Sequence, residues 1–242
     1  MENLVISTAG DAAIFCKLGD QIDPLVSDRV LALNTLIKNA EPEGLIETVP
    51  SYTGIMVYFD PNITSSENLS LTIRSFEKDA KADPQGKATS IIGIPVCYTQ
   101  EYGPDLEYVG SYCGLSSEEL IQIHTSVEYR IYMLGFTPGF PYLGGMDKRL
   151  ATPRLESPRV KIRAGSIGIA GEQTGIYPID SPGGWQLIGK TPVKLIDFNK
   201  NEPFLFKAGD YLKFRSISLQ EYFEIAELQR EGNYKIEKSV RV

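Results

Sequence analysis

The sequence is poor in the residue types that build metal centres and disulfide frameworks. Its 242 residues include one histidine, one tryptophan and three cysteines. A single histidine excludes a multi-histidine metal site. The cysteines are odd in number and widely spaced, at Cys16, Cys97 and Cys113, which indicates neither a disulfide framework nor a cysteine metal cluster. We therefore expect a protein of a reducing cytoplasm without a bound metal ion.

Long apolar runs and an excess of positive charge are also absent. No apolar run reaches the length needed to cross a bilayer, and no basic segment precedes an apolar one at the N-terminus, so we expect no membrane span and no secretory signal. The chain has 24 Lys and Arg against 31 Asp and Glu, a formal net charge of −7. We do not expect nucleic-acid binding, because phosphate contacts require clustered cations.

The composition that remains is that of an ordinary folded globular protein. Hydrophobic residues make up 42% of the chain and charged residues 23%, which is ordinary for a folded domain. The length suits one large domain or two of roughly 100 residues. A polar stretch with proline and glycine at 82–90 is a plausible linker. We predict an α+β protein of two domains, 1–85 and 86–242.

The N-terminal domain is predicted as a ββαββα sandwich-like unit, with its helices on one face of a small antiparallel sheet. Asp23 and Pro24 are typical of a helix start, and apolar spacing then distinguishes helices from strands. No catalytic constellation is visible in this domain, which favours a scaffold or docking role. The expected strands are 4–6, 12–15, 45–49 and 55–59, and the expected helices are 23–39 and 66–81.

The C-terminal domain is predicted to be mostly β structure. Ser116 and Glu119 form a capping box for a helix that ends near His124. From about 127 to 214, short β-prone segments are broken by glycine and proline every eight to twelve residues, which indicates a barrel or sandwich. Further elements are expected as a strand at 91–96 and helices at 105–112 and 218–231.

A glycine-rich stretch with aromatic residues occupies the middle of this domain. Thr137-Pro138-Gly139-Phe140 and Ser181-Pro182-Gly183-Gly184 both match a type II turn, in which proline presets φ and glycine accepts a positive φ. The spacing of Gly165, Gly168, Gly171 and Gly175 fits neither a phosphate loop nor a dinucleotide fingerprint. We interpret these four glycines as bends and close approaches.

The segment from Asp147 to Arg163 is locally basic within an acidic chain, with six cations and two carboxylates. Such a cluster can focus an anionic substrate, and guanidinium groups match carboxylate or phosphate geometry. A solvated loop with weak surface ion pairs explains the same pattern equally well. The candidate substrate-binding cations are Arg154, Arg159 and Lys161.

Four polar or amphipathic residues follow on the glycine-rich segments: Gln173, Tyr177, Trp185 and Gln186. They are suited to line a cleft, with aromatic walls and amides that orient a ligand. The alternative is internal packing with each polar group satisfied inside the protein. We retain all four as candidate substrate-binding residues.

His124 is the candidate catalytic residue, because a histidine is the usual general base near neutral pH. The competing interpretation is a helix-end histidine that interacts with the last carbonyls and the helix dipole. Ser166 is a further candidate substrate-binding residue. A Ser166–His124 triad is disfavoured, because no Gly-x-Ser-x-Gly elbow surrounds the serine.

Three collinear segments resemble one known family. They are Leu-Gly-Phe-Thr-Pro-Gly-Phe-Pro-Tyr-Leu-Gly-Gly at 134–145, Ala-Gly-Ser-Ile-Gly-Ile-Ala-Gly-Glu-Gln-Thr-Gly-Ile-Tyr-Pro at 164–178 and Ser-Pro-Gly-Gly-Trp-Gln-Leu-Ile-Gly-Lys-Thr-Pro at 181–192. They resemble the KipI family, also called allophanate hydrolase subunit 1, and are most like its class of 5-oxoprolinase B-subunits. Two departures are Ile162-Arg163, where the family usually has Val-Pro, and Lys190, where it often has arginine.

The resemblance implies a cyclophilin-like β-barrel for 86–242 and a place in an ATP-dependent 5-oxoprolinase. That enzyme converts 5-oxo-L-proline to L-glutamate, with ATP used by the assembled complex and companion subunits that include an allophanate hydrolase subunit 2-type barrel. Aromatic side chains and proline near such a cleft are typical interface anchors. The expected interface residues are Phe136, Pro138, Phe140 and Tyr142.

The same family allows two other interpretations. Its name-giving member inhibits a sporulation sensor histidine kinase, so a protein-binding regulator is the alternative function. Urea carboxylases contain a related carboxyltransferase part, but this sequence carries no biotin or ATP-grasp segment. An enzyme subunit should respond to 5-oxoproline, whereas a kinase inhibitor should bind a helical bundle.

Overall fold

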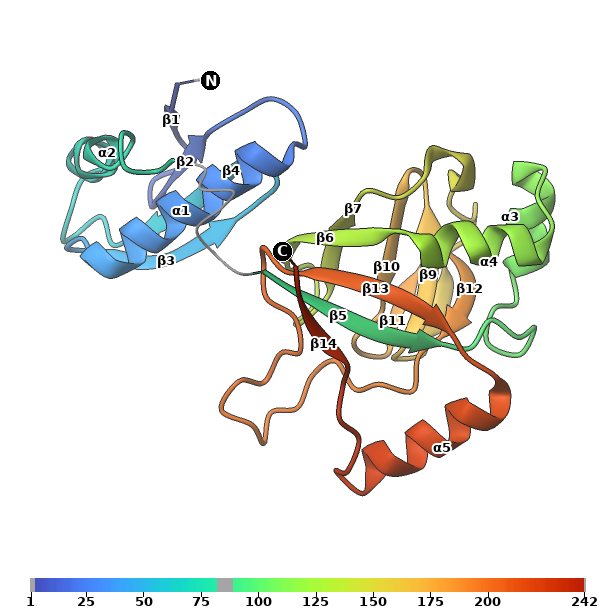
Figure 1. Ribbon diagram of the computed structural model, residues 1–242. Helices are drawn as coiled ribbons and strands as arrows, with labels where there is room; N and C mark the ends of the chain where they lie inside the picture. Colours follow the sequence, from blue (N-terminus) through green and yellow to red (C-terminus); the bar gives the residue numbers. More distant parts are fainter. Residues whose placement is uncertain (1–2, 82–88, 242) are drawn as a thin grey trace. The chain divides into compact units, whose positions relative to one another are not determined.

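The computed structural model describes residues 3–81 and 89–241, and the chain divides into two compact units, Met1–Ala88 and Thr89–Val242 (Figure 1). The predicted boundary between 85 and 86 lies outside the described residues. Among the described helices, none has the length and apolar character needed to cross a membrane.

The N-terminal unit is a four-stranded antiparallel sheet in the order β1-β2-β4-β3, with two helices. Apolar residues of both helices and of alternate strand positions form one core, so both helices lie on the same face of the sheet. The elements are β1 (Val5–Thr8), β2 (Ala13–Lys17), α1 (Pro24–Ala40), β3 (Leu45–Pro50), β4 (Gly54–Phe59) and α2 (Ser66–Ser75).

Helix α2 is shorter than the sequence predicts, and side chains around its end bond to Leu4, just before the first strand. The helix ends at Ser75, and Phe76 is its C-cap. Glu77 accepts a hydrogen bond from the Leu4 amide at 2.7 Å, and Arg74 donates to the Leu4 carbonyl at 3.4 Å. These bonds satisfy backbone groups at the start of the sheet, which the helical pattern alone cannot indicate.

The C-terminal unit contains three sheets, and its described apolar residues form one large core and two smaller clusters. The orders are β14-β5-β13-β6-β7, β10-β9-β12 and β11-β8. Its elements are β5 (Thr89–Val96), α3 (Leu106–Cys113), α4 (Ser117–Ser126), β6 (Glu128–Leu134), β7 (Pro141–Gly144), η1 (Lys148–Leu150), β8 (Arg159–Ile162), β9 (Ser166–Ala170), β10 (Gln173–Ile176), β11 (Ser181–Gly183), β12 (Gln186–Lys190), β13 (Tyr211–Ser216), α5 (Leu219–Arg230) and β14 (Lys238–Arg241).

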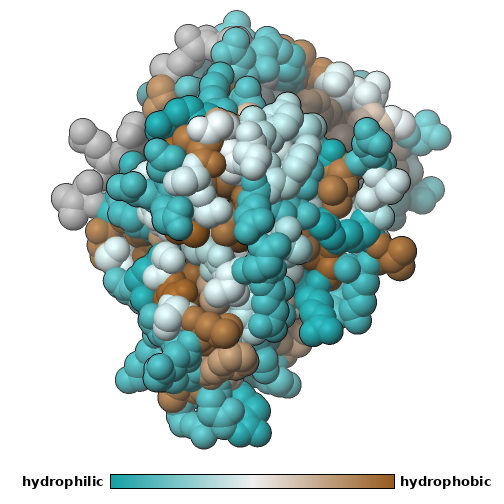
Figure 2. Space-filling view, turned by 90° about the vertical axis from the view of Figure 1, so that its right-hand side faces the viewer, coloured by the Kyte–Doolittle hydropathy of each residue, from teal (hydrophilic) through white to brown (hydrophobic). Residues whose placement is uncertain are grey.

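The expected mixture of helices and sheets is confirmed, but the described strands form separate sheets and do not close into one barrel. Within the five-stranded sheet, β13 runs parallel to β5 and antiparallel to β6. Helix α4 packs against β13 (Figure 1). On the side that carries α3, Figure 2 shows hydrophobic residues in small groups separated by hydrophilic ones.

One of the two predicted type II turns is confirmed and the other is wrong. Gly139 has φ of 73°, and the Phe140 amide donates to the Thr137 carbonyl at 3.1 Å, as the turn requires. Gly183 instead ends strand β11, which pairs with β8. A Cβ atom at Gly183 would lie 2.4 Å from the hydroxyl of Tyr177, so glycine serves a close approach there and not a turn.

Candidate functional site

A small cleft in the C-terminal unit brings together most of the aromatic residues that the sequence analysis singles out. Its volume is about 160 Å³, below the range of roughly 300–1,000 Å³ that is usual for drug-sized ligands. We call it the aromatic cleft. Its lining consists of Phe136, Phe140, Tyr142, Arg154, Gln173, Tyr177, Pro182, Gly183, Gly184 and Trp185.

Each side of the aromatic cleft comes from a different part of the chain. The β6–β7 turn supplies Phe136 and Phe140, and β7 supplies Tyr142. Gln173 begins β10, Tyr177 follows it, and Trp185 lies between β11 and β12. Arg154 belongs to the segment between η1 and β8. Residues that are distant in sequence therefore converge on one small space.

Phe140 is the centre of the aromatic walls. Its ring makes edge-to-face contacts with Tyr142, Tyr177 and Trp185, at centroid distances of 5.5, 5.8 and 5.8 Å. Such pairs add about 0.5–1.5 kcal/mol beyond burial alone. Phe136 sits at the rim, 77% exposed and with φ of 63°, a strained conformation for a bulky residue. The walls are thus packed, while the rim is open.

Two of the four glycines of 165–175 allow this aromatic packing, and the other two lie at bends of the backbone. A Cβ atom at Gly175 would lie 3.0 Å from Phe140 and 3.1 Å from Trp185, and one at Gly168 would lie 3.0 Å from Trp185. Gly165 and Gly171 have φ of 83° and 58°, where glycine is favoured. The interpretation of these residues as close approaches and bends is confirmed.

Arg154 is the only cation among the residues that line the aromatic cleft. Its guanidinium makes no hydrogen bond or ion pair with the described residues, whereas Lys148, Arg149, Arg159 and Lys161 all pair with carboxylates. Burial raises the pKa of Tyr177, and the positive charges of Arg154 and Arg159 oppose that rise together with the Trp185 backbone. An unpaired guanidinium beside aromatic walls is suited to bind a small carboxylate.

Arg159 does not line the cleft, but its side chain bonds to the backbone of Trp185, which does. Its Nη2 donates to both carboxylate oxygens of Asp105, at 2.7 and 2.9 Å, and its Nη1 donates to the Trp185 carbonyl at 3.2 Å. The Leu187 amide also donates to Asp105, at 2.6 Å. We therefore assign Arg159 to holding the Trp185 segment. In the sequence Asp105 indicates only a helix start, so its role in this pair was missed.

Four other candidates do not line the cleft. Lys161 pairs with Asp180 on the surface at 2.9 Å. Ser166 is 5% exposed, and Gln186 is 2% exposed and donates from Nε2 to the Pro153 carbonyl at 3.0 Å. The burial of Gln186 favours the packing alternative, although its Oε1 is a buried atom without a hydrogen-bond partner among the described residues. Pro138 is exposed in its turn but lies outside the cleft lining.

His124 is enclosed in the core, with 0% exposure. Its ring nitrogens contact the Tyr98 hydroxyl at 2.8 Å and the Thr174 hydroxyl at 2.9 Å, so neither nitrogen is left for Ser166. Burial lowers the pKa of His124 to about 3. In this arrangement the histidine does not contact the aromatic cleft. Catalysis by His124 stays a prediction that the geometry does not favour.

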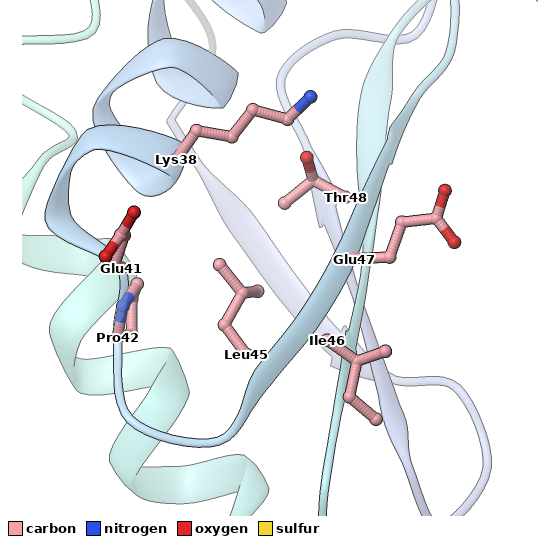
Figure 3. A pocket seen from close by; sticks show the side chains of 7 residues that line it. All are labelled: Lys38, Glu41, Pro42, Leu45, Ile46, Glu47 and Thr48. Carbon is pink, nitrogen blue, oxygen red and sulfur yellow. The ribbon is translucent and has the colours of Figure 1, made fainter.

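A larger hollow in the N-terminal unit is a weaker candidate. Its volume is about 470 Å³, and Figure 3 shows its charged side chains spread apart rather than converging on one point. No aromatic residue lines it. Its lining is Lys38, Glu41, Pro42, Leu45, Ile46, Glu47 and Thr48. Among the described residues of both units, no group of His, Cys, Asp and Glu could hold a metal ion.

Comparison with known proteins defines the family. Residues 4–206 match the family described as carboxyltransferase domain, subdomain C and D. The chain therefore belongs to this carboxyltransferase domain family. The match contains all ten residues that line the aromatic cleft.

Individual relatives confirm the resemblance to the class of 5-oxoprolinase B-subunits. The chain is 45% identical over 226 residues to the 5-oxoprolinase B-subunit of Bacillus subtilis (strain 168), covering 90% of this chain and 94% of that protein. It is 37% identical over 206 residues to the 5-oxoprolinase B-subunit of Escherichia coli O157:H7, with 85% and 92% covered.

Solved structures share the fold. A conserved uncharacterized protein from Pyrococcus horikoshii is 45% identical, with a TM-score of 0.54 and coverage of 90% of this chain and 100% of that chain. The urea carboxylase of Kluyveromyces lactis has a TM-score of 0.82 at 19% identity, and the match covers 98% of this chain and 24% of that chain. The latter likeness concerns the fold alone.

Proposed function

We propose that this chain is a subunit of an ATP-dependent 5-oxoprolinase and that its aromatic cleft binds 5-oxo-L-proline, which the assembled enzyme converts to L-glutamate. Two relatives, at 45% and 37% identity over most of the chain, are named as B-subunits of 5-oxoprolinase. The observation that carries the proposal is an unpaired Arg154 in a small cleft with aromatic walls.

The chemistry of 5-oxoproline matches this lining group by group. The substrate is a five-membered cyclic amide with one carboxylate. Arg154 can bind the carboxylate through two parallel charge-assisted hydrogen bonds. The Phe140 and Trp185 rings offer apolar surface to the ring carbons, and the Gln173 side chain places an amide at the wall. An amide carries both a donor and an acceptor, as the lactam does.

ATP is assigned to the assembled complex and not to this cleft. A volume of about 160 Å³ is small for a nucleotide, and the nearby glycines serve packing and turns. Companion subunits, among them an allophanate hydrolase subunit 2-type barrel, would supply the nucleotide site. Phe136 and Pro138 are exposed and suit the subunit interface, whereas Phe140 is 4% exposed and belongs to the wall.

Replacing Arg154 should weaken use of the substrate without affecting assembly. In the reconstituted enzyme we expect Arg154→Ala to raise KM for 5-oxoproline by at least about 10- to 150-fold, because each of the two charge-assisted hydrogen bonds to the carboxylate contributes about 1.5–3 kcal/mol. Steady-state kinetics at saturating ATP measure this. The matched control is Arg163→Ala, since Arg163 is also without an ion pair among the described residues but does not line the cleft. An unchanged KM in Arg154→Ala would place the carboxylate elsewhere.

The isolated chain should be inactive. We expect no 5-oxoproline-dependent ATP hydrolysis from it alone, because no nucleotide-binding motif is recognisable in its sequence. Adding the companion subunits should restore the activity, with co-elution in size-exclusion chromatography. If the chain binds no companion, ignores 5-oxoproline and instead binds the helical dimerisation region of a sensor histidine kinase, the KipI-like inhibitor function replaces this proposal.

A further inference from the structure

The single histidine of the chain joins two sheets of the C-terminal unit. His124, on the last turn of α4, stacks on Phe214 of β13 with ring centroids 4.5 Å apart and an interplanar angle of 20°. Its ring nitrogens reach Tyr98, just after β5, and Thr174 in β10. Strands β5 and β13 belong to the five-stranded sheet, while β10 belongs to the three-stranded sheet.

The hydrogen bonds around His124 share one direction when the Thr174 hydroxyl donates to the backbone. The Thr174 hydroxyl donates its single hydrogen to the Gly168 carbonyl at 3.0 Å, so its oxygen must accept from His124 Nε2. With the proton on Nε2, a neutral ring has an acceptor at Nδ1. The Tyr98 hydroxyl therefore donates to Nδ1. The series of hydrogen bonds runs from Tyr98 through His124 and Thr174 to Gly168.

Burial supports the protonation states that these hydrogen bonds require. It lowers the pKa of His124 to about 3, which leaves the imidazole neutral near neutral pH. It also raises the pKa of Tyr98 far above its usual value, which keeps the hydroxyl protonated as a donor. Both shifts have the same cause, because a charge in this enclosed position would lose its hydration.

The far end of this hydrogen-bond series lies beneath the aromatic cleft. Thr174 stands between Gln173, which lines the cleft, and Gly175, where Phe140 and Trp185 approach closely. Gly168 is the paired residue of Gly175 on β9, and Trp185 packs over it. The Thr174–Gly168 bond therefore ties β10 to β9 at the place where both strands support the cleft residues.

We propose that His124 is a positioning residue. As the neutral Nε2–H tautomer it bonds to Thr174, and through Thr174 it holds strands β9 and β10 in place beneath Gln173 and Trp185. It does not touch the ligand. The identity of the ligand rests on the proposed function, whereas the hydrogen-bond series and its effect on Trp185 do not. The role differs from both interpretations of the histidine that the sequence offers, a general base and a helix-end residue.

The test uses the only histidine and the only tryptophan of the chain as reporters. Nitrogen-15 NMR of the wild-type imidazole should show the Nε2–H tautomer, unchanged between pH 5 and 8. Thr174→Val keeps the shape but removes the hydroxyl, and it should shift the Trp185 emission. Thr174→Ser retains the hydroxyl and should leave the emission as in the wild type. In the reconstituted enzyme, Thr174→Val should raise KM for 5-oxoproline about 2- to 10-fold, the loss expected for one neutral hydrogen bond.

Three results would overturn the proposal: an Nδ1–H tautomer, an imidazole that titrates near pH 6.5, or the same Trp185 emission in Thr174→Val and the wild type. The NMR measurement needs only the wild-type protein, so it decides even if a variant fails to fold. The emission and NMR readouts need no substrate. If they hold while Arg154→Ala leaves KM unchanged, the proposed binding of the substrate carboxylate in this cleft fails and the positioning role stands.

Discussion

Lowering the pH from 7 to 5 should reduce the free energy of unfolding by about 2 kcal/mol, and His124 should account for most of that loss. Burial lowers the pKa of His124 from its ordinary 6.5 to about 3 in the folded protein. Between these two values the unfolded chain binds a proton that the folded chain does not. Stability therefore rises with pH across this window, by up to about 1.4 kcal/mol per pH unit.

Other groups with shifted pKa values change the free energy of unfolding mainly below pH 5. Hydrogen bonds from Arg149 lower the pKa of Asp147, and a hydrogen bond from Lys161 lowers the pKa of Asp180. A carboxylate with a lowered pKa contributes stability that is lost only as the pH falls through its ordinary value near 3.8 and below. The interval from pH 7 to pH 5 therefore isolates the histidine.

Urea unfolding at pH 5, 6 and 7 measures the effect. The control is His124→Gln, which removes the titrating group while its amide can still donate toward Thr174. That variant can be less stable at every pH, but its free energy of unfolding should change far less between pH 7 and pH 5. Equal pH dependence in the two proteins would show that His124 is not the buried neutral group described here.

Removing the carboxylate of Asp105 should destabilise the protein by up to about 3 kcal/mol, the lower limit for breaking a buried ion pair, because this pair is partly buried. Asp105 and Arg159 side chains are 13% and 28% exposed. Without the carboxylate, the Arg159 guanidinium loses its partner and the Leu187 amide loses its acceptor. Because Arg159 also donates to the Trp185 carbonyl, the Trp185 emission should shift as well.

The control for this pair lies on the same strand. Lys161 of β8 pairs with Asp180, but these side chains are 67% and 48% exposed, and exposed pairs contribute little. We expect Lys161→Ala to leave the urea midpoint almost unchanged. A double-mutant cycle of Asp105→Ala and Arg159→Ala should give a clear coupling energy. Additive effects of the two changes would show that the pair does not act as a unit.

Local chemistry is sufficient to predict many elements of the fold. The capping box of Ser116 and Glu119 is present, with each side chain bonded to the backbone of the other residue. Asp23 caps α1 through its side chain, as the Asp23-Pro24 pair indicates. The turn at 137–140 follows from proline and glycine in adjacent positions. In each case the interacting groups are within four residues, so the signal is in the local sequence.

Elements that depend on distant partners are not predicted. Strand β14 has four exposed residues and no alternating pattern, and pairing with β5 defines it. Side chains around the end of α2 bond to Leu4, which is 73 positions from Glu77 and 70 from Arg74. The stretch at 181–184 matches a turn, but Ser181–Gly183 pairs with β8. Backbone groups form hydrogen bonds with whichever partner the fold places within reach. A partner that is distant in sequence cannot be recognised from the local sequence pattern.

The aromatic cleft most clearly separates what the sequence determines from what only the tertiary structure decides. The sequence by itself determined the family, the glycine-rich segments and a set of cations and aromatic residues from which a site could be built. Only the tertiary structure decided that Arg154 lines the cleft without a partner among the described residues, while Arg159 is bound to Asp105, 54 residues away. The two arginines belong to one basic segment and look alike in sequence, because the carboxylate that pairs with Arg159 is brought to it only by folding.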